Sequence, residues 1–115
     1  MDSLAYKIET RGAWAKAQSA GVYTGSALDV TDGFIHLSAL DQVRATMAMW
    51  FKDQPDLILA KIDLTTLGET VVWEASRGGA LFPHIYGPIS MSAVREVIDL
   101  PLLADGSHDL PVSFP

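Results

Sequence analysis

The sequence predicts an α+β domain in which two helices come early and a run of strands follows. Two segments, Arg11–Ala20 and residues 39–51, carry apolar side chains at helical spacing. Beyond residue 51 the apolar segments are short, strand-like and separated by turn residues. A doubly wound parallel sheet would instead alternate strand and helix along the whole chain.

The first third of the chain begins with a short strand at residues 4–8. Thr10 is placed to cap the first helix, Arg11–Ala20, and Gly21 to end it. The next segment, residues 22–32, contains turn residues and is predicted to be a loop.

A second strand is predicted at residues 34–38, directly after the Asp32-Gly33 turn. Ser38 and Asp41 resemble a capping box, so the second helix is expected over residues 39–51.

The rest of the chain reads as strands. Residues 57–62 are almost continuously apolar, as in a central strand covered on both faces. Further strands are predicted at residues 70–74 and 94–102. Residues 82–89 contain two prolines, which favours an edge strand or a bulge over a sheet centre.

The length of 115 residues indicates one domain. We expect it to span residues 1–103, with a polar C-terminal tail at 104–115 that packs loosely. The composition, 49% hydrophobic and 19% charged, is that of a folded protein with a real core.

Several classes of protein are disfavoured by composition. Cysteine is absent, which removes disulfides and thiolate metal sites. No basic and apolar leader opens the sequence, and no apolar run is long enough to span a bilayer, so we expect a cytoplasmic protein with no membrane partner. The net charge of −6 disfavours extended nucleic-acid binding, although a local pocket for one phosphate stays open.

His36 is the first candidate catalytic residue. Strand alternation places His36 and Ser38 on one face, and the strand leads into a helix N-terminus, which favours an anion. The alternative is a structural histidine whose ring nitrogens are satisfied by neighbours.

Two further groups are candidates. Arg77 lies beside Gly78 and Gly79, which combine a guanidinium with close backbone access to a ligand; an ordinary surface turn is the alternative. His84 and Tyr86 are two residues apart and project to the same side of an extended chain, where they could grip a ribose, stack on a base, or simply pack.

The histidine spacing disfavours a tightly bound zinc or iron ion. No pair has the four-residue helical spacing of a zinc protease. A site built from His36, His84 and an acid is the remaining metal alternative. The G-x-S-x-G pattern of a nucleophile elbow is absent.

The strings DGFIHLS at residues 32–38 and SRGGALFPHIYG at 76–87 resemble the bacterial family catalogued as domain of unknown function 952. The resemblance covers residues 4–100. It implies an ADP-ribosyltransferase-like fold, with a split, bent sheet and a cleft for a nicotinamide dinucleotide. The chain is more distantly similar to RNA 2′-phosphotransferases, whose HLS string matches His36 to Ser38 here.

Two departures from the transferases of that fold matter. Lys7 stands where they carry a ribose-binding histidine or arginine, and residues 78–87 contain no acid that could stabilise positive charge on a ribose. The resemblance implies that NAD, ADP-ribose or a related nucleotide binds in a cleft around His36. Lys7 and Arg77 would neutralise phosphate and Tyr86 would stack on a ring. The alternatives are a binding module without chemistry and a structural or interaction domain without a ligand.

Overall fold

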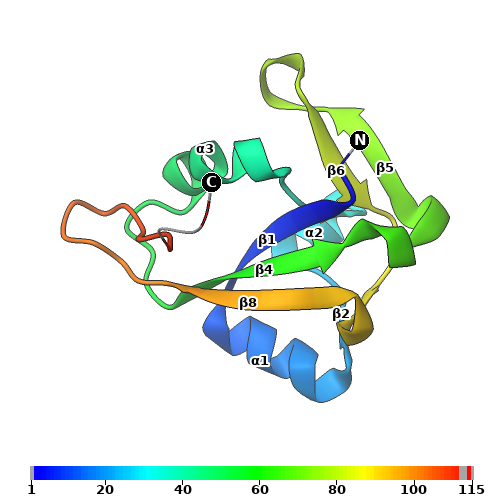
Figure 1. The fold of residues 1–115 in the computed structure, drawn as a ribbon, viewed down its shortest axis with the longest axis horizontal. Helices are drawn as coiled ribbons and strands as arrows, with labels where there is room; N and C mark the ends of the chain where they lie inside the picture. The colour runs from blue at the N-terminus through cyan, green and yellow to red at the C-terminus, as the bar shows by residue number, and fades with distance from the viewer. Residues whose placement is uncertain (1, 112–113, 115) are drawn as a thin grey trace.

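The computed structural model describes residues 2–111 and Phe114, apart from the side chain of Arg77. Its centre is a three-stranded antiparallel sheet in the order β1-β4-β8 (Figure 1). The strands are β1 (Leu4–Thr10), β4 (Leu57–Asp63) and β8 (Val94–Leu100). The prediction that the apolar run after residue 56 forms a central strand is confirmed.

The two faces of this sheet bury different clusters, because successive side chains along a strand point to opposite sides. On one face, Ala5, Ile58 and Ala60 pack beneath α1 (Arg11–Ala20) through Trp14 and Ala17. On the other face, a second set packs against α3 (Val43–Trp50) and the C-terminal segment. It comprises Tyr6, Ile8, Leu57, Leu59, Leu100, Val43, Met47 and Phe114.

A second antiparallel sheet has the order β3-β6-β5. It contains β3 (Ile35–His36), β6 (Leu81–Ile85) and β5 (Val71–Ala75), while β2 (Val22–Tyr23) pairs with β7 (Ile89–Ser90). The expectation that the proline-containing segment is an edge was wrong for β6, which is the middle strand. Pro83 is tolerated because it faces Leu37, just past the end of β3. There its carbonyl accepts the Leu37 N–H, and its missing N–H lies beyond the last pair of the ladder.

The first helix, α1, begins and ends where the sequence predicts. The Thr10 side chain accepts the Ala13 N–H, and Gly21 adopts the left-handed conformation with φ 79°. The second predicted helix is shorter than expected. A 3₁₀ turn, η1 (Leu40–Gln42), precedes α3. Gln42 caps the N–H of Ala39, so the expected capping box of Ser38 and Asp41 does not form.

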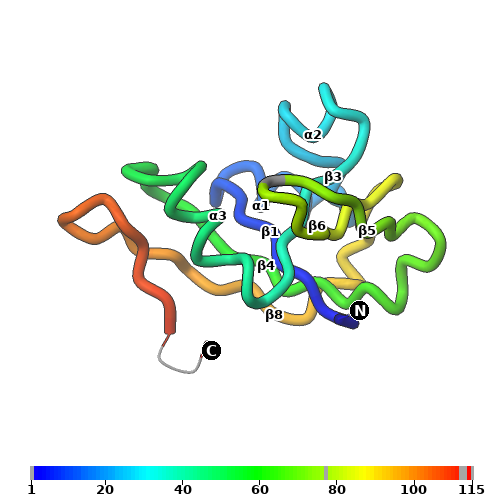
Figure 2. Tube along the Cα trace, turned by 90° about the horizontal axis from the view of Figure 1, so that it is seen from above, coloured from blue at the N-terminus to red at the C-terminus, as the bar shows by residue number. Residues whose placement is uncertain are grey.

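A third helix, α2 (Ala27–Asp32), occupies the segment that the sequence predicted to be a loop. A capping box explains it: Ser26 accepts the Asp29 N–H, and Asp29 accepts the Ser26 N–H. Gly33 then ends the helix with φ 86°. Figure 2 shows α2 as a turn of chain that stands out beside β3. The prediction of only two helices was therefore wrong.

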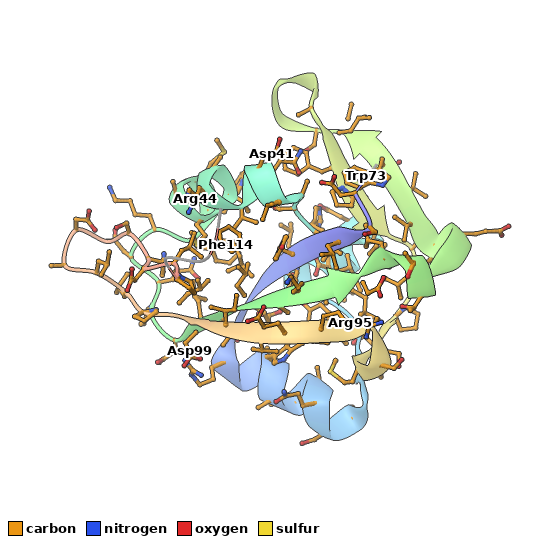
Figure 3. The ribbon with its side chains drawn as sticks, viewed as in Figure 1. Asp41, Arg44, Trp73, Arg95, Asp99 and Phe114 are labelled. Atoms are coloured by element: carbon orange, nitrogen blue, oxygen red, sulfur yellow. The ribbon has the colours of Figure 1, made fainter. Side chains whose placement is uncertain are left out.

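The C-terminal segment packs on the sheet rather than loosely. Phe114 is buried against Tyr6, with ring centroids 5.5 Å apart, and the Arg44 guanidinium lies 5.3 Å from its ring (Figure 3). His108 is also buried and contacts the Gln54 carbonyl at 2.7 Å. Phe114 therefore ties this segment to the second face of the central sheet, and His108 ties it to the loop between α3 and β4.

Mixed α and β structure with antiparallel pairing is the architecture that results. Short 3₁₀ turns join the strands at η2 (Leu64–Thr66), η3 (Gly68–Thr70), η4 (Arg77–Gly79) and η5 (Met91–Ala93). Each strand pair in the described residues is antiparallel, which excludes a doubly wound parallel sheet there. Within residues 2–111 and 114, no helix has the length and apolar character that crossing a membrane requires.

Candidate functional site

Four rings gather on one face of the second sheet, and we call Phe34, His36, His84 and Tyr86 the ring cluster. The β3–β6 register places His36 directly opposite His84, with their ring centroids 5.5 Å apart. The Phe34 ring stacks on that of His84 at 4.1 Å with an interplanar angle of 23°. It also lies 4.6 Å from the His36 ring and 5.3 Å from that of Tyr86. Cross-strand pairing thus joins two segments that are about fifty residues apart in sequence.

Glu74 joins the ring cluster from β5. It pairs with Phe82 in the β5–β6 register and is therefore the diagonal neighbour of His84. Its Oε1 lies 2.7 Å from His84 Nδ1 and accepts the Tyr86 hydroxyl at 2.7 Å. The hydrogen bonds from Tyr86 and His84 lower the pKa of Glu74, and the same contact with Glu74 raises the pKa of Tyr86.

Asp29, on α2, is the buried centre of a second polar network. Its side chain is 2% exposed, and both carboxylate oxygens are used. Oδ2 accepts from Lys7 Nζ and from the Ser26 N–H, each at 2.8 Å. Oδ1 accepts the His36 N–H at 3.1 Å and lies 2.6 Å from His36 Nδ1. The carboxylate therefore fixes both the backbone and the ring of His36.

The balance of charges keeps Asp29 ionised. Burial alone would raise its pKa. The Lys7 charge, together with hydrogen bonds from Lys7, Ser26 and His36, more than compensates, so the pKa of Asp29 lies below its ordinary value. Gly25 makes the approach possible, because a Cβ there would lie 2.8 Å from the Asp29 Cβ.

Lys7 is enclosed rather than presented to a ligand. It is 7% exposed, and its ammonium donates to Asp29 Oδ2 and to the His36 carbonyl at 3.0 Å. Beneath it, the Tyr23 hydroxyl donates to Glu9 Oε2 at 2.6 Å, and burial together with Glu9 raises the pKa of Tyr23. Lys7 is thus a buried ion-pair partner that supports the position of His36, in place of the phosphate-neutralising role expected for it.

Asp32 contacts the other ring nitrogen of His36. Its Oδ2 lies 2.9 Å from Nε2, and its side chain is 38% exposed, against 33% for His36. Asp29 and Asp32 are one helical turn apart on α2, so their carboxylates reach the same imidazole from one side of the helix. His36 therefore sits between a buried and an exposed carboxylate.

A groove of about 470 Å³ lies beside the ring cluster. Tyr86, Phe34 and Asp29 belong both to its lining and to the networks above. The rest of the lining comes from α2 and from the chain around β3 and β6, namely Thr24, Val30, Gly33, Ile35, Ile85, Gly87 and Pro88. His36 does not line this groove, and it approaches the lining through its ring contact with Phe34.

The other candidate residues are dispersed. Ser38 pairs with Tyr6 of β1, and its hydroxyl lies 3.0 Å from that of Thr46 on α3. Its partners are therefore in β1 and α3, whereas those of His36 are in α2 and β6. Gly78 and Gly79 form the tip of the β5–β6 hairpin and do not line the groove. The side chain of Arg77 lies outside the described part of the structure. The expected approach of a helix N-terminus to His36 also fails, because η1 and its Gln42 cap intervene.

A second cavity lies away from the ring cluster. This cavity of about 500 Å³ lies under the C-terminal segment, where Tyr6, Lys61 and Phe114 are among its lining residues. Among the described residues, no group of three or more His, Asp or Glu side chains is arranged to hold a metal ion.

Four residues of the site were not selected from the sequence as site residues: Asp29, Asp32, Glu74 and Phe34. The Ser26-x-x-Asp29 spacing is a capping-box signal and could have revealed both α2 and Asp29. Glu74 could be selected only once the register of the β5–β6 hairpin was known, and the sequence alone does not give that register. Glu74 brings a carboxylate to His84 and Tyr86, although residues 78–87 themselves contain no acid.

These features define a small domain whose described residues form three antiparallel sheets, two of three strands and one of two, with a carboxylate–histidine cluster where β3 and β6 meet. Residues 8–97 match the family model described as "Protein of unknown function (DUF952)", and the chain belongs to that family. No curated protein gives a significant match to the chain.

Solved structures of a related protein agree with the fold. The crystal structure of protein CC0527 from Caulobacter crescentus is 50% identical, with a TM-score of 0.89 over 93% of this chain and 94% of that one. A crystal structure of its double mutant gives 48% identity and the same TM-score over the same shares of both chains. The solution NMR structure of CC0527 is 49% identical with a TM-score of 0.81, covering 92% of this chain and 91% of that chain.

Proposed function

We propose that this chain binds NAD, ADP-ribose or a related phosphorylated nucleotide at the ring cluster and the adjoining groove. The observation that carries the proposal is the position of Tyr86, which is 45% exposed, lines the groove, and is held by Glu74. A planar base or pyridine ring stacks on exposed aromatic side chains of this kind. Glu74 can accept hydrogen bonds from ribose hydroxyls, since its Oε2 is not used by His84 or Tyr86.

The volume and the largely apolar lining of the groove agree with a ligand of this size. Small-molecule sites are concave and largely apolar, with a few placed polar groups, and occupy about 300–1,000 Å³. The groove has about 470 Å³ and combines apolar side chains with the carboxylate of Asp29. Phe34 also lines the groove, and its ring stacks on that of His84.

Binding is tested by thermal unfolding with a panel of nucleotides at millimolar concentration. A ligand at about one hundred times its Kd stabilises the native state by about 2.7 kcal/mol, which raises the Tm by several degrees. The Tyr86→Ala variant should lose this rise. Leu81→Ala, which removes a similarly exposed side chain from the same hairpin outside the groove, should keep it. The proposal fails if no member of the panel raises the Tm of the unchanged protein.

A transferase activity is the second candidate, and the contact of Glu74 with His84 favours it. In such a reaction with NAD, the bond between ribose C1′ and nicotinamide breaks, nicotinamide leaves with the bond electrons, and an acceptor attacks C1′. A carboxylate near the ribose stabilises the positive charge that develops there. The transferase candidate would be supported if the unchanged protein releases nicotinamide from NAD and the Glu74→Gln variant still binds NAD but no longer releases nicotinamide. Binding without release in the unchanged protein would leave a binding module.

A structural or interaction domain without a ligand is the third candidate. Its support is the mutual pairing of Lys7, Asp29 and His36, which satisfies their charges internally. The nucleotide panel separates this candidate from the first two, because a purely structural network gives no ligand-dependent rise in Tm.

A further inference from the structure

The Nε2 atom of His36 contacts a carboxylate that is partly exposed to solvent. Asp32 is the last residue of α2, and its side chain is 38% exposed. A partly exposed ion pair of this kind contributes little to stability, because water and salt screen it. Asp29, by contrast, is buried and fixed by several donors. The two carboxylates on His36 therefore differ in how readily each can be replaced.

The chemistry of the imidazole decides what can replace Asp32. An ionised carboxylate only accepts hydrogen bonds, so a ring nitrogen that hydrogen-bonds to one must be the donor. Asp29 holds Nδ1 at 2.6 Å, which leaves Nε2 as the donor that can exchange partners. Any replacement must be an acceptor, and an anion is the strongest of these.

The geometry at Nε2 points the same way. Asp32 Oδ2 lies 2.9 Å from Nε2, so this position already holds one oxyanion oxygen. When the Asp32 side chain turns away into water, a phosphate oxygen of a ligand can take the same place.

We propose that His36 Nε2 is the oxyanion-binding atom of this site and that Asp32 occupies it until a ligand phosphate displaces it. Asp32 thus competes with the phosphate groups of the ligand, and Asp29 is a positioning residue that keeps the ring in place during the exchange. This inference rests on the proposed function, since it assigns the phosphate contact of the same nucleotide. It also gives His36 the phosphate-binding role that enclosed Lys7 does not take.

The test compares ADP-ribose with adenosine, which lacks the phosphates, by calorimetric titration. The Asp32→Asn variant removes the competing charge and should bind ADP-ribose more tightly, by between roughly threefold, if water screens the pair fully, and roughly a hundredfold, for two charges some 6 Å apart near a protein surface. Its affinity for adenosine should stay unchanged. Asp41→Asn makes the same change in net charge at another exposed aspartate and should alter neither affinity.

A second readout follows the ring itself by nitrogen NMR of His36 in the unchanged protein. ADP-ribose should shift the Nε2 resonance and leave the Nδ1 resonance, held by Asp29, nearly unchanged. Equal or weaker ADP-ribose binding by Asp32→Asn would overturn the inference, as would an unchanged Nε2 resonance at saturation. In either case ADP-ribose binding by the unchanged protein would leave the proposed function standing. Failure of both variants and the unchanged protein to bind either compound would overturn both.

Discussion

The carboxylate of Asp29 holds His36 at two points, through the backbone N–H at 3.1 Å and through ring Nδ1 at 2.6 Å. The same carboxylate receives the Lys7 ammonium at 2.8 Å from the central sheet. One buried acid thus ties α2, β1 and β3 together. This junction determines both the stability of the region and the orientation of the candidate ligand-binding histidine.

Replacing Asp29 by Asn should be strongly destabilising. The substitution leaves the buried Lys7 ammonium without its counter-charge, and removal of one partner of a buried ion pair costs about 3–5 kcal/mol. The free energy of unfolding, measured by urea denaturation, checks this. Asp99→Asn is the matched control, because its pair with Arg11 is exposed on both sides and its loss should change stability little. Equal effects of the two substitutions would contradict a central role for Asp29.

The stability of the protein should depend on the ionisation of Asp29 in acid. Its pKa in the folded protein lies below the ordinary value, so the folded state favours the charged form. This contribution is fully present above the unfolded-state pKa of about 3.9 and disappears as the pH falls through the lower folded-state pKa. The difference in unfolding free energy between the unchanged protein and Asp29→Asn should therefore shrink below about pH 4. A difference that stays constant from pH 7 to pH 2 would contradict the shift.

Gly25 should tolerate substitution much less well than Gly78. Both have positive φ, 108° and 66°, so alanine is strained at each. Only at Gly25 would the new Cβ also press on Asp29, at 2.8 Å from its Cβ, while Gly78 has open space around it. Denaturation of Gly25→Ala should show a loss well above the cost of about 1 kcal/mol expected for Gly78→Ala. The opposite order would mean that Asp29 does not need this close approach.

Removing the Phe114 ring should destabilise the second face of the central sheet. The ring is buried against Tyr6, and truncation of a buried Phe to Ala costs about 3–5 kcal/mol. Leu102→Ala, at a side chain that is 40% exposed, should cost much less. Unfolding measurements that give equal, small losses for both variants would show that the C-terminal segment packs loosely after all.

Local patterns in the sequence predicted those elements whose causes are local. The cap at Thr10 and the stop at Gly21 gave α1 its bounds, and the unbroken apolar run gave β4 its central place. The prediction that Pro83 marks an edge strand was wrong. A proline removes only one backbone hydrogen bond, and at Pro83 that bond would fall where β3 has already ended. The segment of α2 was predicted to be a loop because of its turn residues, although the Ser26 and Asp29 capping box can be recognised in the sequence.

The candidate site was only half accessible to sequence reasoning for a related physical reason. Alternation along the chain indicates that His84 and Tyr86 share a side, and the structure brings both to the Phe34 ring, which also contacts His36. The partners that hold these rings, Asp29 and Glu74, depend on the capping of α2 and on hairpin register. Ser38 follows a different element because the chain leaves β3 after His36 and pairs with β1.

The measurement that tests the central claim most directly is a titration of ADP-ribose into the nitrogen-labelled protein, followed by amide NMR. The account predicts a saturable response centred on residues 32–36 and 84–88, which form β3, the end of β6 and the lining of the groove. It predicts little change at Lys61 and Val97, which line the cavity between the central sheet and the C-terminal segment. A response centred on that cavity, or no response at millimolar ADP-ribose, would contradict the claim that the ring cluster is a nucleotide-binding site.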